Sequence, residues 1–369
     1  MLNFMEIVFC GDLVLDEPNP EYWLSGIAPA LQSADLAVGH LEVPHTQSTL
    51  ELNGDVPAPG ADPGHLAALP DAGIRVLTLA GNHMSDCGER GIIDTREGVN
   101  RLGLACCGAG INLEEARRPA VLSISEKLVS VLSYNCVGPE NGWATETKAG
   151  VAFIRIDNAD GGPITPSATL DQVSWESVKS MQQDIVTAKH NSDIVIVALH
   201  KGIVHTPALL ASYEQPVSYA AVDAGADVVI GHHAHIIRGI EFYRGKPIFH
   251  GLGNGCVVTK ALSPDQEHPA RADWVLKRKL LFGFEPDPEY CLAPFHPEAV
   301  NSMLGYVRWY SNGRIESGFI PVHVEPPGRP VIADDTKAKE IIDYVEHITM
   351  KAGLPPLSLK KKKHWVAVS

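Results

Sequence analysis

The sequence lacks several features that would assign it to a specialised class of protein. Its 369 residues include only seven cysteines, an odd number, and no Cys-x-x-Cys pair, so neither a disulfide framework nor a structural zinc knuckle is indicated. No apolar run approaches the roughly 18 residues of a membrane span. The first residues have no basic region, long apolar core or cleavage site typical of a signal peptide. We therefore expect a cytoplasmic protein without a membrane span.

Positive charge is also scarce. Lys and Arg together number 30 against 44 Asp and Glu, which gives a formal net charge of -14 at pH 7. This balance argues against general binding to nucleic-acid phosphates. With 45% hydrophobic and 20% charged residues, the composition is that of an ordinary globular protein. The length suits one large domain or two ordinary ones.

Histidines collect directly after one apolar run. Residues 228–230 are Val-Val-Ile, which predicts a buried strand, and the next five residues are Gly-His-His-Ala-His. Open α/β sheets usually build their sites at the carboxyl ends of strands. Neutral imidazole is the commonest metal ligand that proteins supply. The run and its histidines therefore indicate a candidate metal site.

Four other predicted strands end in the same way. They cover residues 4–10, 35–39, 74–80 and 193–199, and helical patterns separate them. The polar residues that follow these strands are Asp12, His40, Glu42, Asn82, His83, His200 and His205. One such strand end is weak support, but five in alternation with helices point to one shared site. A set of carboxylate, amide and imidazole groups without thiolates suits Mn, Fe or Zn in a catalytic centre.

The remaining patterns give the expected local structure. Helices are predicted at 20–34, 62–72, 89–102, 170–190, 217–224 and 335–352, and hairpins at 120–134, 236–250 and 303–323. The Pro- and Gly-rich loop 43–62 is expected to fold over the surface. Residues 260–300, rich in Pro and aromatics, are expected to form a lid or a subunit-contact insertion. The lysines at 360–363 predict a solvated tail.

The order of these motifs resembles that of a known family. In chain order, the motifs are Gly11-Asp12, Leu41-Glu42, Gly81-Asn82-His83-x-x-Asp86-x-Gly88, His200-x-Gly202, Gly231-His232-His233-x-His235 and Gly251-Leu252-Gly253-Asn254. Over about residues 5–256 they resemble the CapA family of poly-γ-glutamate capsule synthesis proteins, in the calcineurin-like metallophosphoesterase superfamily. The resemblance implies an α/β sandwich of two mixed β-sheets flanked by helices. It also implies a CapA-like metallophosphoesterase domain over 1–330, followed by a C-terminal helix and basic tail over 331–369.

The resemblance further implies roles for individual residues. Metal ligands are implied at Asp12, Glu42, Asn82, His200, His233 and His235, with Glu42 as a bridging ligand. His83 is implied as the general acid or oxyanion-stabilising residue, and Asp86 as the residue that orients it. Further candidates for metal or substrate contact are His40, His232, His205, Asn254 and Lys201.

This chain departs from the family pattern at several positions. Val14 stands where the superfamily has a histidine, so one metal lacks its usual imidazole. His40 stands where the family has Asn, which makes it a candidate for that ligand or for substrate contact. Lys201 replaces a frequent Trp, and His250-Gly251 replaces Tyr-Ser.

A site of this composition predicts a metal-dependent hydrolase in which a divalent metal, expected as a pair of Mn, Fe or Zn ions, activates water. The residue set does not distinguish a phosphoester from an ester, lactone or amide. The expected substrate is a small or oligomeric anionic molecule, and a homo-oligomer is possible. The alternative is a non-catalytic or polymer-processing protein of capsule or poly-γ-glutamate biosynthesis that retains the fold.

Overall fold

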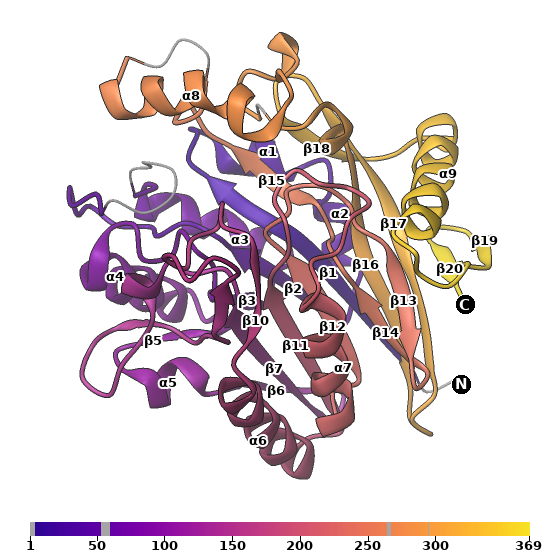
Figure 1. Ribbon diagram of the computed structural model, residues 1–369. Coiled ribbons are helices and arrows are strands. Elements are labelled where there is room, and N and C mark those ends of the chain that lie inside the picture. The colour runs from indigo at the N-terminus through magenta and orange to yellow at the C-terminus, as the bar shows by residue number, and fades with distance from the viewer. Residues whose placement is uncertain (1–3, 53–59, 264–266, 294) are drawn as a thin grey trace.

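Two mixed β-sheets pack face to face, and helices cover their outer surfaces (Figure 1). The computed structural model describes residues 4–52, 60–263, 267–293 and 295–369. The larger sheet contains β1 (Phe4–Leu15), β2 (Leu36–Leu41), β3 (Val76–Thr78), β4 (Ala105–Cys107), β15 (Asn254–Val258), β16 (Asn301–Tyr310), β17 (Ile315–Glu325), β18 (Arg329–Ile332), β19 (Leu359–Lys361) and β20 (Val366–Val368). The smaller contains β6 (Ala120–Ile124), β7 (Lys127–Asn135), β11 (Ile194–His200), β12 (Val228–His232), β13 (Ile240–Tyr243) and β14 (Lys246–Phe249). The predicted α/β sandwich is thereby confirmed.

The helices lie outside the two sheets. They are α1 (Pro20–Leu24), α2 (Ala28–Gln32), α3 (Ala68–Asp71), α4 (Gly88–Arg101), α5 (Leu113–Arg117), α6 (Trp175–Asn191), α7 (Glu214–Ala224), α8 (Pro269–Phe282) and α9 (Asp335–Lys351). In Figure 1, α6 and α7 lie beside the smaller sheet, α9 lies beside β17, and α8 lies at one end of the molecule. No helix in the described parts of the chain is long and apolar enough to cross a bilayer.

The core follows from the two-residue period of the strands. On β1, Ile7 and Phe9 belong to the apolar cluster between the two sheets, where Ile196 of β11 also packs. Val8 and Cys10 belong to a second cluster, which the helices cover. Successive strand residues point to opposite faces, so both faces of this strand are apolar. Each large buried side chain contributes roughly 1.5–3 kcal/mol to folding.

Strand register brings the polar strand ends together. Asp12 pairs with His40 across β1 and β2, and His40 pairs with Thr78 across β2 and β3. In the other sheet His200 pairs with His232. These pairs belong to parallel ladders, whose carboxyl ends meet at one edge of a sheet. The edges of both sheets contribute side chains to one site.

Glycine at position 11 is required by a close approach of backbones. A Cβ atom there would lie 2.0 Å from the carbonyl oxygen of Gly253, so only glycine allows β15 to pair with β1 beside Asp12. The ladder between β1 and β15 also shifts register next to Asp12. Such irregularities commonly re-aim a side chain next to a functional site.

Several predictions of local structure were confirmed. The three expected hairpins are present as β6–β7, β13–β14 and β16–β17. Helix α4 and helix α9 lie where their patterns predict them. Asp62 accepts a hydrogen bond from Gly64 N–H, as expected of an N-cap, although the turn that follows is a 3-10 helix.

Other predictions were wrong. The helix expected over 20–34 is broken into α1 and α2. Pro29 lies in the first turn of α2 and has no N–H to donate to the preceding turn, so one continuous helix cannot form there. The helix expected from 170 begins only at Trp175, since Leu170–Val173 pairs with residues 156–158 as a strand. Helix α8 was not predicted. Of the loop 43–62, residues 43–46 are buried rather than at the surface, and 53–59 lie outside the described residues.

The C-terminal segment is part of the larger sheet. The side chains of Lys360 to Lys363 are exposed, as expected, but β20 pairs with β17 and β19 pairs with β20. Trp365 is buried against Tyr306, with ring centroids 4.5 Å apart. The tail therefore contributes to the core through Trp365, Val366 and Val368.

We expect Trp365→Ala to lower the free energy of unfolding by about 3–5 kcal/mol, the usual cost of deleting a buried Trp side chain. Urea denaturation followed by circular dichroism measures this change. Trp175→Ala is the matched control, because that side chain is 58% exposed and should change stability by less than about 1 kcal/mol. Equal changes in the two variants would contradict a structural role for the tail.

Candidate metal centre

Two overlapping groups of side chains bring metal-binding atoms together. One is Asp12, His40 and His200, and the other is Asp12, Glu42 and His235. Within each group one ligand atom per residue lies within 4.8 Å of the others. Asp12 belongs to both groups, which is the arrangement that two adjacent cations sharing a carboxylate would need.

The atoms of these groups are buried and short of partners. Within the described residues, both oxygens of Glu42, Oδ1 of Asp12 and Nε2 of His40 have no hydrogen-bond partner. Both ring nitrogens of His233 are in the same condition. Each buried polar atom left unpaired costs about 1–3 kcal/mol. A divalent cation among them would satisfy several of these atoms at once, so the residues fit a metal centre.

The histidine rings are packed against one another. The ring of His40 lies 4.5 Å from that of His232 and 4.8 Å from that of His200. His232 Nδ1 also lies 3.2 Å from Asp12 Oδ1. His40 is held from behind, because its Nδ1 lies 2.9 Å from the Thr78 hydroxyl. That contact leaves Nε2 of His40 facing the cluster.

Burial keeps three of these imidazoles neutral. It lowers the pKa of His40, His232 and His233 to about 3 in each case. Neutral imidazole is the form that binds metal. At neutral pH these side chains therefore need no deprotonation before a cation can bind.

The two carboxylates repel each other in a buried space. Burial and the charge of Glu42 raise the pKa of Asp12 to about 7. Burial opposes the charge of Glu42 as well, but His235 lowers its pKa to about 2. The same pair raises the pKa of His235 to about 9 despite burial. His235 Nε2 lies 3.4 Å from Glu42 Oε1, so without metal this imidazolium balances the carboxylates.

Three histidines near the cluster have left-handed backbone. The φ angles are 55° at His205, 91° at His233 and 53° at His235. Such a conformation costs of order 1–3 kcal/mol for residues other than glycine. It is held by hydrogen bonds, because His233 N–H donates to the Asp12 carboxylate and His205 N–H donates to the Ala234 carbonyl. Three of the seven non-glycine residues with positive φ in the described parts of the chain are thus histidines of one site.

The Asn82–His83–Asp86 segment follows β3 and reaches the same place. Asn82 Oδ1 lies 2.6 Å from His200 Nε2, and His83 lines the cavity over the cluster. His83 Nδ1 lies 2.7 Å from Asp86 Oδ2. A carboxylate on one ring nitrogen fixes the orientation of an imidazole and directs its other nitrogen outward.

The remaining candidate residues lie at different distances from the cluster. Asn254 contacts it directly, since its Oδ1 lies 2.9 Å from His235 Nδ1. His205 lines the cavity, with its ring 6.0 Å from that of His235. Lys201 does not line the cavity, because its ammonium donates to Glu214 at 2.9 Å.

Lys201 belongs to a buried network of charges behind the site. Its Nζ also lies 2.9 Å from His250 Nδ1, and His250 Nε2 lies 2.7 Å from Glu241 Oε1. Arg238 approaches Glu214 on its other oxygen at 3.1 Å. Two of the departures from the family pattern, at 201 and 250, therefore contact each other.

A cavity opens above the cluster. The polar part of its lining consists of Glu42, Asn82, His83, His233 and His235, together with Asp16, His205 and Thr259. The apolar part comes from β1, β15, the loops after β2 and β11, and described residues between 261 and 295. It consists of Val14, Val43, Val204, Val257, Ala261, Leu262, Trp274, Phe282 and Phe295.

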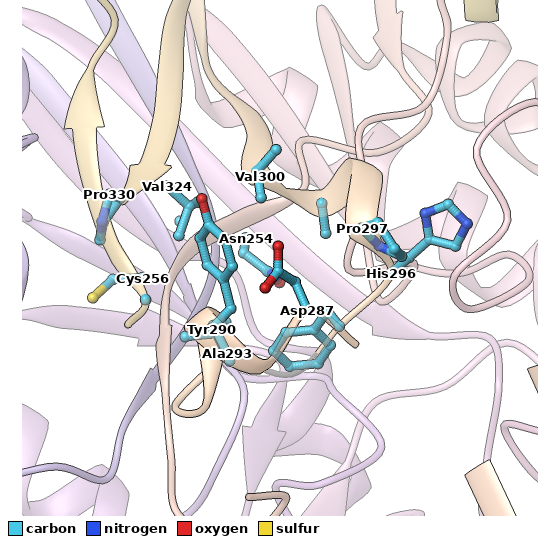
Figure 2. A pocket seen from close by; sticks show the side chains of 15 residues that line it. Asn254, Cys256, Asp287, Tyr290, Ala293, His296, Pro297, Val300, Val324 and Pro330 are labelled. Atoms are coloured by element: carbon cyan, nitrogen blue, oxygen red, sulfur yellow. The ribbon is translucent and has the colours of Figure 1, made fainter. Parts of the chain in front are cut away.

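A second, smaller cavity lies next to the first (Figure 2). Phe295 and Val257 line both cavities. Figure 2 shows Asn254 from β15 beside Asp287 and Tyr290 of the segment before residue 294. Because Asn254 also holds His235, this cavity lies directly behind the cluster.

Sequence reasoning missed several residues of the first cavity. Asp16 accepts a hydrogen bond from the Thr259 hydroxyl at 2.7 Å, and both line the cavity. Trp274 and Phe282 come from α8, which has no clear helical period. The abundance of aromatics over 260–300 was the one signal for this wall, and residues 264–266 and 294 of that stretch lie outside the described residues.

Comparison with known proteins gives a consistent set of relatives. The model of one family, described as "Bacterial capsule synthesis protein PGA_cap", matches residues 6–257. "Capsule biosynthesis protein CapA" of Bacillus anthracis is 25% identical over 245 residues, which are 65% of this chain and 55% of that protein. A "Probable polyglutamine synthesis accessory protein" of Mycobacterium tuberculosis is 31% identical over 196 residues, 52% of this chain and 47% of its own. The chain thus matches about half the length of these curated relatives.

Solved structures include a similar arrangement. The calcineurin-like phosphoesterase YfkN of Bacillus subtilis aligns with 94% of this chain and 99% of its own chain. Its TM-score is 0.43 and its sequence identity is 11%.

Glu214→Gln should lower the free energy of unfolding at pH 7 by about 3–5 kcal/mol, because it leaves the buried charges of Lys201 and Arg238 without their carboxylate. Glu97→Gln is the matched control, since it removes an exposed ion pair with Arg101 and should cost under about 1 kcal/mol. Urea denaturation measures both.

The cost of Glu214→Gln should also depend on pH. Although burial opposes its charge, Arg238 and Lys201 lower the pKa of Glu214 from 4.5 to about 2. A carboxyl with a lower pKa in the folded chain stabilises fully above its unfolded pKa and loses that effect as pH falls through the folded value. The difference between wild type and variant should therefore shrink below pH 4.5. A difference that stays constant down to about pH 2.5 would contradict the ion-pair explanation.

Proposed function

The chain belongs to the bacterial capsule synthesis protein family PGA_cap, and from this premise and the geometry of its polar cluster we propose that it is a metal-dependent hydrolase. The observation that carries the proposal is the pair of ligand groups that share Asp12. Their atoms are buried and several have no partner among the described residues. A bound cation would offset the free-energy cost of leaving these buried atoms unpaired.

The residues assigned to hold the metal come from both groups. His40 and His200 would bind one divalent ion, Glu42 and His235 the other, and Asp12 would contact both. Asn82 and His233 are the remaining proposed metal ligands. Both contact the side chain of His200. When bound, Mn, Fe or Zn in such a site lowers the pKa of water and polarises a substrate oxygen. This assignment makes Asp12 the bridging ligand in place of Glu42.

The chain's own groups supply the proton chemistry. His83 lies in the cavity wall with Asp86 behind it. An imidazole held in this way donates a proton to a leaving group or stabilises charge that develops on it. These roles suit hydrolysis of a phosphoester, an ester, a lactone or an amide.

A second function is favoured by the names of the relatives. They are described as a capsule biosynthesis protein and as a polyglutamine synthesis accessory protein, which suits a non-catalytic or polymer-processing role for the same fold. The two proposals differ in turnover. Metal-loaded protein that hydrolyses neither bis(p-nitrophenyl) phosphate nor p-nitrophenyl acetate would favour the second.

Replacing His40 with Asn should lower the metal content by one ion per chain, because Asn removes the imidazole nitrogen that faces Asp12 and His200. The measurement is elemental analysis of protein dialysed against Mn²⁺. His190→Asn is the control, because His190 is exposed on α6. Unchanged stoichiometry in both variants would remove His40 from the ligand set.

His83→Ala should keep its metal and lose catalytic rate by roughly 10²–10⁴-fold, the usual contribution of a general acid or base. Turnover and metal content are measured on the same preparation. His190→Ala, with its exposed side chain, should change neither. Loss of metal in parallel with rate would make His83 a ligand instead.

A further inference from the structure

The cavity above the metal centre has a polar and an aromatic part. Glu42 and His235 belong to the polar part, with Asp16, His205 and Thr259, whereas Trp274, Phe282 and Phe295 form the aromatic part. Resting on the proposed hydrolase function, we infer that the substrate carries an apolar group, aromatic or alkyl, directly beside the bond that is cleaved. This group packs against the three aromatic side chains while the reacting part contacts the metal centre.

The aromatic wall begins one ring away from the polar cluster. Phe295 stacks on His235 with ring centroids 4.6 Å apart. The ring of His205 lies 4.9 Å from Phe282 and 5.0 Å from Phe284, each in an edge-on arrangement. A group held here therefore lies next to the His235 side chain. Ligand pockets commonly combine such apolar walls with a few oriented polar groups.

The charges around the cavity argue against a polyanionic polymer as substrate. Among the described residues that line it there is no Lys or Arg, whereas Asp16 and Glu42 are acidic. Two nearby cations face carboxylates, since Arg271 pairs with Glu51 and Lys260 with Glu17. Arg278, buried on the same face of α8 as Trp274, is not among the lining residues. With a net charge of -14 over the whole chain, a polymer of carboxylates would be repelled.

Helix α8 is built to cover this cavity. Trp274, Arg278 and Phe282 follow a spacing of four, so they share one face, and the Arg278 guanidinium lies 5.8 Å from the Trp274 ring. Leu280, on the opposite face, is 87% exposed. Arg271, in the first turn of α8, forms an ion pair at 2.5 Å with Glu51 in the loop after β2. The helix therefore presents its aromatic face to the metal centre from above.

The test compares two tetrahedral anions that differ only in their apolar group. Phenylphosphonate and methylphosphonate are titrated calorimetrically into the Mn²⁺-loaded full chain. The phenyl compound should bind at least about 10-fold more tightly, because it buries an additional ring. Phe282→Ala and Trp274→Ala should each remove most of this ratio. Leu280→Ala, on the exposed face of α8, should keep it.

Competition with a short poly-γ-glutamate completes the experiment. The polymer should not displace phenylphosphonate when the concentration of its carboxylate groups equals that of phenylphosphonate. Equal affinity of the two phosphonates, binding of neither, or displacement by poly-γ-glutamate would each overturn the inference. Turnover measured separately distinguishes the two proposals. A chain that binds metal and prefers the phenyl compound but has no hydrolase activity refutes the proposed function alone, and an active chain without the preference refutes only the apolar subsite.

Discussion

The exclusion of water from Asp12 and Glu42 is the constraint on which the rest of the site depends. Two carboxylates that water cannot reach must be balanced by something within contact distance, and the chain supplies imidazoles on every side. With His235 protonated, the cluster has an internal counter-ion. A bound divalent metal would take over that role and free the imidazole to act as a ligand. The pairing of parallel strands in both sheets is what brings these groups together.

The buried network behind the site shows how a family pattern can change without loss of the fold. A lysine at position 201 would be costly to bury alone. Here Glu214 balances it, Arg238 shares that carboxylate, and His250 accepts contact from the other side. Lys201 and His250 contact each other, so the two departures from the family pattern at these positions depend on one another structurally. They alter the support of the loop after β11 rather than the cavity lining.

The residues of the polar cluster could be predicted because they arise from local patterns, whereas the two-sheet architecture was implied by the resemblance of the motifs to those of the CapA family. Alternation of apolar residues fixes a strand, and the polar residue at its end then lies at the sheet edge. The partners of Lys201 could not be predicted, because they come from three separate elements and no local spacing links them. Helix α8 was missed for a related reason. Its apolar residues face a ligand cavity on one side and solvent on the other, as exposed Leu276 and Leu280 show, so its sequence has no single apolar stripe.

The left-handed backbone at His233 has a consequence for engineering this protein. Glycine would adopt the same angle at no steric cost, so a library selected for thermal stability alone would favour glycine at this position. That gain in melting temperature would remove an imidazole from the centre. Stability and function are therefore opposed at one identifiable codon, and a selection that includes a metal-dependent readout is needed to keep both.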